Sequence, residues 1–178
     1  MVFKILQWNI NGFINNYLEL VLLIRDYQPD LLSIQETHIP FNNSNTIVPK
    51  TYCSYFHNLS INKSSKQGVG MLIKKHLPHK EILINSSLSV IALEINIGFI
   101  FTVVNIYIPP CQNFNNTAIL HILNQIKTPI ILTGDVNSWS PLWGSEISND
   151  RGQIFENIIF SNNLIVLNNG KPTHFSAL

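Results

Sequence analysis

Short runs of apolar residues recur along the chain, with Gly, Pro and Asn between them. Each run has four to eight residues and is apolar at both alternating positions, which is typical of strands buried on both faces. The predicted strands are residues 3–8, 31–35, 69–73, 90–95, 99–106, 130–133 and 164–167. This pattern indicates a core built on β-sheets.

Three further segments have apolar residues at helical spacing, together with start and stop signals. The first is expected to begin after Asn16 and to stop at Pro29, the second to follow Thr117 and end before Pro129, and the third to open with a capping box at Asp150. Each helix is expected to bury one face. The predicted inner faces are Ile14, Leu18, Val21 and Leu22; then Ile119, Ile122, Leu123 and Ile126; then Phe155, Ile158 and Ile159.

The order of these elements predicts the fold class. Residues 3–36 and 99–133 each combine strand, helix and strand, which is the pattern of a crossover between parallel strands. Consecutive strands over residues 53–107 favour antiparallel pairing between the two units. We therefore expect an α/β fold, with mixed sheets and helices outside, forming a single domain over residues 1–178.

Composition limits the possible partners. The chain has 178 residues, of which 46% are hydrophobic and 12% are charged, and its net charge is +1. A strong basic field of the kind that attracts nucleic acid non-specifically is therefore not expected. If DNA is a partner, it must be bound through a local site, neutral donors or a metal ion.

Two further features of the sequence indicate the compartment of the protein and whether it crosses a membrane. Cys53 and Cys111 are too few for a disulfide framework and do not form a zinc motif, and a signal peptide is not evident at the N-terminus. Residues 88–108 are apolar enough to suggest a spanning helix, but Asn96 and Gly98 favour two strands that meet there. We expect a nuclear or cytoplasmic protein with no membrane partner.

Polar side chains follow four of the apolar strands at the point where each strand ends. They bear carboxylate, carboxamide or phenol groups: Asn9 and Asn11, Glu36, Asn105 and Tyr107, and Asp135 and Asn137. Acids directly after very hydrophobic strands are costly unless a cation or hydrogen bonds compensate. Oxygen ligands without Cys or His suit a hard ion such as Mg²⁺ or Mn²⁺.

Each of these residues also has a purely structural interpretation. Asn9 and Asn11 could form a turn into the first helix, Glu36 could hold a neighbouring loop, and Tyr107 could belong to the core. Asp135 follows a glycine, as acids in turns often do. Only their joint occurrence at strand ends favours a site.

The ordered motifs carry a family resemblance. QWNING (residues 7–12), IQETH (34–38), NIYIPP (105–110) and TGDVNS (133–138) resemble the endonuclease/exonuclease/phosphatase superfamily. Pro141–Ser145, Asn149–Gly152 and Leu167–Thr173 are similar to the apurinic-type endonuclease domain of jockey-like non-LTR retrotransposons. The resemblance covers essentially the whole chain.

This resemblance implies a two-layer β-sandwich with helices outside, which nicks DNA and leaves a 3′-hydroxyl that primes reverse transcription. It implies that Glu36 is the metal ligand, with Asn11, where many relatives have Asp, as a weaker or water-mediated one. It also implies that Asp135 and Asn137 position the attacking water. Asn9 and Tyr107 would hold the scissile phosphate, and Thr173 would lie near the DNA.

The family pattern continues beyond the Pro-Thr motif with further strands and a Ser-Asp-His ending, which this sequence does not contain. We expect the domain to lack its final strands, to have an unpaired sheet edge, and to be weakly active or inactive. His174 does not match the missing histidine. Two alternatives stay open: a non-catalytic remnant or fragment of a polyprotein that includes a reverse transcriptase, and another phosphoesterase of the same superfamily.

Overall fold

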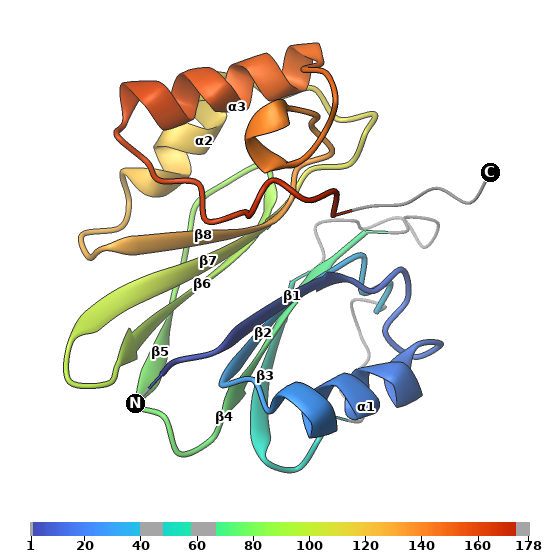
Figure 1. The fold of residues 1–178 in the computed structure, drawn as a ribbon. Helices are drawn as coiled ribbons and strands as arrows, with labels where there is room; N and C mark the ends of the chain where they lie inside the picture. The colour runs from blue at the N-terminus through green and yellow to red at the C-terminus, as the bar shows by residue number, and fades with distance from the viewer. Residues whose placement is uncertain (1, 40–47, 58–66, 174–178) are drawn as a thin grey trace.

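The computed structural model describes residues 2–39, 48–57 and 67–173, and in this part of the chain two four-stranded sheets pack face to face (Figure 1). The first sheet has the order β1 (Ile5–Asn9), β2 (Leu31–Gln35), β4 (Val69–Lys74), β3 (Tyr52–His57). The second has the order β5 (His79–Ile82), β6 (Ser89–Asn96), β7 (Ile100–Tyr107), β8 (Ile130–Asp135).

Helices cover the outer face of each sheet (Figure 1). Helix α1 (Tyr17–Tyr27) lies on the first sheet, and α2 (Asn116–Leu123) and α3 (Asp150–Ser161) lie on the second; a short 3₁₀ helix, η1 (Pro141–Trp143), precedes α3. Strand β1 is parallel to β2 and β7 is parallel to β8, while the other pairs are antiparallel. The predicted α/β class and both crossover units are confirmed.

Three apolar clusters build the four layers. The cluster between the sheets combines side chains of β2 and β4 with those of β6 and β7, such as Met71 and Leu93. A second cluster lies between the first sheet and α1, and a third lies between the second sheet and helices α2 and α3. Both faces of the central strands are therefore buried, which explains why these strands are largely apolar on both faces.

The apolar stretch at residues 88–108 forms β6 and β7, which meet at a turn around Gly98, as predicted. No helix in the described part of the chain is long and apolar enough to cross a membrane.

The inner face predicted for α1 is wrong. Ile14 and Leu18 are 63% and 79% exposed, and Val21 and Leu22 are also exposed. The helix instead packs through Leu20, with Tyr17 and Ile24 beside it. Because α1 is apolar almost all round, its periodicity did not identify the face that contacts the sheet.

The strand predicted at residues 164–167 is also wrong. These residues run irregularly after α3, and Ile165 and Leu167 are exposed. A short apolar run becomes a strand only where a neighbouring strand accepts its hydrogen bonds. None of the eight described strands pairs with it.

Two helix starts differ from their predictions by one or two residues. Asn115 caps α2 and Asn149 caps α3, and their side chains accept hydrogen bonds from the backbone N–H groups of Ala118 and Gly152. Asp150, predicted as the cap, lies in the first turn instead, where its negative charge suits the helix dipole.

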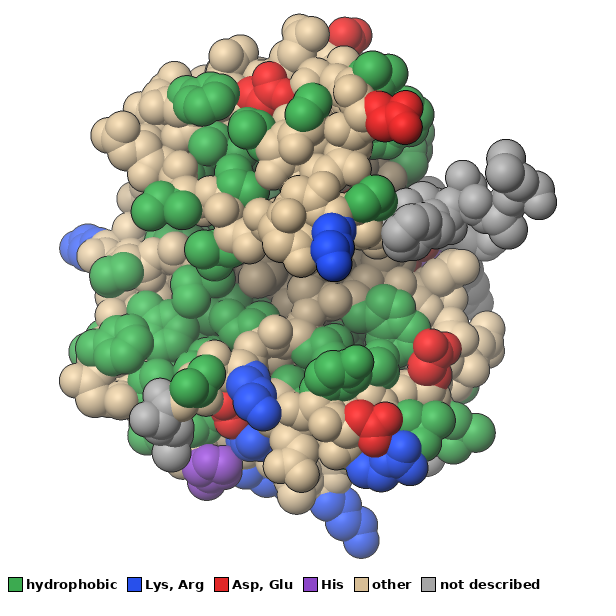
Figure 2. Space-filling model, in the orientation of Figure 1, with side chains coloured by type: hydrophobic (Ala, Val, Ile, Leu, Met, Phe, Trp, Pro, Cys, Tyr) green, Lys and Arg blue, Asp and Glu red, His purple; other side chains and the backbone are tan. Residues whose placement is uncertain are grey.

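Strands β1 and β8 are both edge strands, and in the described residues each is paired on one side only. Figure 1 looks onto these two edges, and Figure 2 shows hydrophobic side chains gathered between the two layers on the same face. Phe3, Phe99 and Phe101 form aromatic contacts there at the sandwich end, and Phe99 is largely exposed. Every open sheet has two edge strands, so an edge left by missing final strands stays a prediction.

Candidate active site

Four of the predicted site residues meet at one end of the sandwich. Asn9 donates hydrogen bonds from Nδ2 to both Glu36 Oε1 (2.9 Å) and Asp135 Oδ2 (2.7 Å). The Tyr107 hydroxyl donates to the same Glu36 Oε1 at 2.9 Å. One amide nitrogen therefore joins a carboxylate from the first sheet to a carboxylate from the second.

The strand register brings these side chains to the same rim. Asn9 at the end of β1 lies opposite Gln35 at the end of β2, and Tyr107 at the end of β7 lies opposite Asp135 at the end of β8. Because both pairs are parallel, the two strands of each pair end at one rim, and the hydrogen bonds from Asn9 to Asp135 and from Tyr107 to Glu36 bring the two rims together. Glu36 follows β2 with a φ of 52°, which turns the chain at this rim.

Gly134 allows β8 to approach β7 at the residue before Asp135. Its φ is 139°, and a Cβ atom at this position would lie 2.0 Å from the carbonyl oxygen of Ile106. Any other side chain would move β8 away from β7. The glycine of the TGDVNS motif is thus needed to bring Asp135 level with Tyr107.

Asn137 fixes the second carboxylate oxygen. Its backbone N–H donates to Asp135 Oδ1 at 2.9 Å, and its Nδ2 donates to the carbonyl oxygen of Ile108 at 3.1 Å. Both oxygens of Asp135 therefore accept a hydrogen bond from a neutral group. Asn137 also ties the loop after β8 to the loop after β7.

The phenol of Tyr107 stays protonated at neutral pH. Burial raises the pKa of Tyr107 well above its usual value, and the hydrogen bond to Glu36 and the negative charges of Glu36 and Asp135 act in the same direction. Tyr107 is therefore a hydrogen-bond donor at this site.

In the described part of the chain, positive charge acts on the carboxylates of the site without a direct lysine or arginine contact, since Arg151 interacts with Asp135 only through space. Neither Glu36 nor Asp135 forms an ion pair with a lysine or arginine among the described residues; His38 Nε2 lies 3.7 Å from Glu36 Oε2. Two half-buried carboxylates held this close repel one another unless a cation compensates.

This donor set fits a hard divalent cation. The described residues contain no group of three Asp, Glu, His or Cys side chains that could form a complete protein cage for a metal. Mg²⁺ does not require one, because it is commonly held by one or two carboxylates, with water and phosphate oxygens completing its shell. Glu36, with Asp135 beside it, offers that arrangement.

Asn11 and Thr173 lie outside this hydrogen-bonded group. Asn11 is exposed, and it reaches the group only through its backbone N–H, which donates to Asn9 Oδ1 at 3.3 Å. Thr173 is exposed, in the irregular segment that follows α3. His174 lies outside the described residues.

Asn105 was grouped with the strand-end residues, and that placement is wrong. It is fully buried between the sheets, where it accepts a hydrogen bond from Gln35 Nε2 and donates to the carbonyl oxygens of Ile34 and Gly70. Asn105 is two residues before Tyr107 on β7, so both side chains point between the sheets, but Asn105 lies deeper, away from the rim. Asn105 therefore holds the sheets together behind the site.

Two residues near the site were not proposed from the sequence. His38 belongs to the IQETH motif and is close to Glu36, but a lone histidine after a strand has many structural explanations. Arg151 belongs to the Asn149–Gly152 motif, and its contacts with the loops after β7 and β8 become visible only in the fold.

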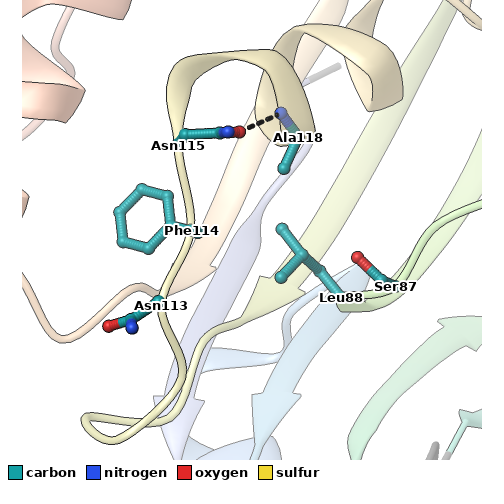
Figure 3. Close-up of a pocket in the computed structure, with 6 residues that line it drawn as sticks. All are labelled: Ser87, Leu88, Asn113, Phe114, Asn115 and Ala118. Atoms are coloured by element: carbon teal, nitrogen blue, oxygen red, sulfur yellow. Dashed lines mark hydrogen bonds between the residues drawn. The ribbon is translucent and has the colours of Figure 1, made fainter.

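A depression of about 440 Å³ lies nearby but contains none of the site residues (Figure 3). It lies between the segment that enters α2 and the residues just before β6. Its lining residues are Ser87, Leu88, Asn113, Phe114, Asn115 and Ala118. The depression is open to solvent, and no carboxylate is among its lining residues.

The curated proteins that this chain matches are retrotransposon proteins, and their sequence identity to it is low. The chain is 28% identical over 181 residues to the probable RNA-directed DNA polymerase from transposon X-element of Drosophila melanogaster, and 26% identical over 177 residues to the RNA-directed DNA polymerase from mobile element jockey of the same organism. These alignments cover 98% and 97% of this chain. The chain spans about 19% of the length of each relative.

Solved structures share the fold. The endonuclease domain of TRAS1, a telomere-specific non-LTR retrotransposon, superposes with a TM-score of 0.70 at 18% identity, over 93% of this chain and 75% of that one. An AP endonuclease from Archaeoglobus fulgidus gives a TM-score of 0.65 at 17% identity, over 90% and 71%. The two-layer sandwich flanked by helices is thus the architecture implied by the resemblance.

A model of one protein family matches residues 6–176, which is nearly the whole chain and includes every residue of the site. The protein therefore belongs to the Endonuclease/Exonuclease/phosphatase family.

Proposed function

We propose that this chain is a DNA endonuclease that hydrolyses a phosphodiester with the help of Mg²⁺ or Mn²⁺. The observation that supports this most directly is the bridge from Asn9 to both Glu36 and Asp135. It assembles, from two different sheets, an oxygen-rich site with two carboxylates and two neutral donors. Such a site suits a cation and a phosphate together.

We assign the metal to Glu36, with Asn11 at the edge of the site as a residue that reaches it through water. The cation would polarise a phosphate oxygen and stabilise charge on the leaving oxygen. Asp135 would accept a proton from the attacking water, and the backbone N–H of Asn137 keeps its carboxylate oriented. This division of roles uses both carboxylates that accept hydrogen bonds from Asn9.

Asn9 and Tyr107 would hold the scissile phosphate. Both are donors, and Tyr107 keeps its proton because its pKa is raised. Neutral donors suit a chain with a net charge of +1, since the phosphate need not be attracted by a basic patch. Thr173 would contact DNA away from the reacting phosphate.

DNA is the substrate that we favour over a small phosphoester. The support comes from the relatives, which are RNA-directed DNA polymerases of mobile elements, and from the TRAS1 endonuclease domain. In an intact element, we propose, a reverse transcriptase follows this domain and uses the nicked DNA as a primer. Action on DNA requires entry into the nucleus, and the free thiols of Cys53 and Cys111 are compatible with a nuclear or cytoplasmic protein.

The proposal is tested by nicking of supercoiled plasmid in the presence of Mg²⁺. We expect nicking that is abolished by a chelator and by Glu36→Gln. Glu94→Gln, at a half-buried residue of β6 that pairs with Lys80 away from the site, is expected to leave nicking intact. A folded chain that nicks no DNA with Mg²⁺ or Mn²⁺ would contradict the proposal. Hydrolysis of a small phosphodiester without nicking would favour a different phosphoesterase.

A further inference from the structure

Arg151 connects the two loops that leave the site. It lies in the first turn of α3, and its guanidinium donates to backbone carbonyls only. The acceptors are Val136 O (2.6 Å from Nη2 and 3.2 Å from Nε), Ile108 O (3.1 Å), Pro109 O (3.2 Å), Pro110 O (3.3 Å) and Gln112 O (2.9 Å). One side chain thus contacts five carbonyl oxygens.

These carbonyls belong to residues adjacent to the site. Val136 lies between Asp135 and Asn137, and Ile108 directly follows Tyr107. The Ile108 carbonyl also accepts from Asn137 Nδ2, and the Ile108 N–H donates to the Asp135 carbonyl at 3.0 Å. Arg151 and Asn137 therefore hold the same two loops, and both donate to the Ile108 carbonyl oxygen.

The guanidinium is satisfied without a carboxylate partner. It is half-buried and forms no ion pair with any described acid. Burial lowers the pKa of Arg151, while the nearby negative charge of Asp135 acts in the opposite direction. Phe114 packs against the cation, with the guanidinium carbon 4.8 Å from the ring centroid; Figure 3 shows Phe114 on the segment that enters α2.

The start of α3 is itself fixed to the loop after β8. Asn149 Oδ1 accepts from the N–H groups of Gly152 (2.7 Å) and Trp139 (3.0 Å). A Cβ atom on Gly152 would lie 1.8 Å from the Trp139 carbonyl oxygen, so only glycine permits this approach. The Asn149–Gly152 turn thereby fixes the Arg151 backbone close to the loops after β7 and β8. The Arg151 side chain reaches the carbonyl oxygens of both loops from this position.

We propose that Arg151 is a positioning residue, which fixes the distance between Tyr107 and Asp135 so that both act on one phosphate. This inference rests on the proposed nuclease function. A planar guanidinium with five N–H groups satisfies several carbonyls at once, whereas the three-donor ammonium of lysine does not. Arg151 touches neither the substrate nor the reacting atoms, and it acts through the two loops.

Nicking kinetics test the inference with Arg151→Lys, which keeps the charge. We expect kcat per folded molecule to fall about 10- to 100-fold, because misplacing a reacting group by about 1 Å has an effect of this size. KM for plasmid is expected to stay within about twofold. The matched control is Arg25→Lys at the other arginine of the chain, which is exposed and pairs only with Asp26. An unchanged kcat in Arg151→Lys, after correction for the folded fraction, would overturn the inference.

Hydrogen exchange tests the same inference without relying on activity. In Arg151→Lys, the amides of Ile108 and Asn137 are expected to exchange at least about tenfold faster, because local opening becomes easier when the carbonyl contacts weaken. The amide of Met71, in a central strand, is expected to be unchanged. If the wild-type chain does not nick DNA, the proposed function fails, and exchange alone still decides whether Arg151 holds the loops. Unchanged exchange at Ile108 and Asn137 would refute that.

Discussion

Gln35 Nε2 donates a hydrogen bond of 2.6 Å to Asn105 Oδ1 in the fully buried interior between the two sheets. Asn105 uses its own amide to donate to the carbonyls of Ile34 (3.0 Å) and Gly70 (2.9 Å). Gln35 immediately precedes Glu36, and Asn105 is two residues before Tyr107. The polar contact between the sheets is therefore directly behind the site, and it fixes how the two halves of the site face one another.

Replacing Asn105 by leucine is expected to destabilise the protein by about 2–5 kcal/mol. The change removes three hydrogen bonds from the buried interior, the one from Gln35 Nε2 and those to the carbonyls of Ile34 and Gly70, and each buried group left unsatisfied costs about 1–3 kcal/mol. Urea unfolding measures the loss. Asn157→Leu on the exposed side of α3 serves as the control. A loss below about 1 kcal/mol would mean that water or a rearranged Gln35 satisfies these groups.

Mg²⁺ is expected to stabilise the folded chain, whether or not the chain cleaves DNA. At about a hundred times its dissociation constant, a ligand that binds only the folded state adds about 2.7 kcal/mol. Thermal unfolding with and without Mg²⁺ measures this, and Glu36→Gln is expected to remove the effect while Glu94→Gln retains it. Equal stabilisation of the wild type and Glu36→Gln would place the cation elsewhere.

Stability is expected to fall as the pH rises above about 10. Burial, with the negative charge of Asp30, raises the pKa of Tyr52 to about 12, and the pKa of Tyr107 is raised as well. In the unfolded chain, tyrosine ionises near pH 10. Each raised tyrosine pKa therefore contributes its full stabilisation of the folded state below pH 10. This stabilisation is lost as the pH rises from 10 through the tyrosine pKa of the folded protein, by roughly 1.4 kcal/mol per pH unit for each tyrosine.

Urea unfolding between about pH 8 and pH 11.5 tests this, with Tyr52→Phe and Tyr107→Phe each expected to reduce the slope. Tyr27→Phe, at a residue that is 61% exposed, should leave the slope unchanged. A slope in both buried variants equal to that of the wild type would show that these phenols ionise normally.

The two faces of α1 are expected to respond differently to the same substitution. Leu20 is fully buried, and Leu20→Ala should cost about 2–5 kcal/mol, since it removes apolar contact and leaves a cavity. Leu18 is exposed, and Leu18→Ala should change stability by no more than about 0.5 kcal/mol. Chemical denaturation of both variants is sufficient. The reverse order would show that Leu18 faces the sheet.

The sequence by itself determined the core of the site. Each of Asn9, Glu36, Tyr107 and Asp135 lies at the end of an apolar strand, and two crossover units predict that such strands run parallel. Because parallel strands end at the same rim, the placement of Asn9 beside Glu36 and of Tyr107 beside Asp135 followed from local pattern and topology. That the two rims meet was decided by the packing of the two sheets. The fold class was predictable for the same reason.

Only the tertiary structure decided which surfaces are buried and which carbonyls are used. Helix α1 is apolar almost all round, so its inner face depends on where the first sheet lies. The run at 164–167 became a loop because no described strand is placed to pair with it. The role of Asn105 required the second sheet to face the first. The contacts of Arg151 are with backbone carbonyls, which every residue possesses, so no residue type in the sequence marks them.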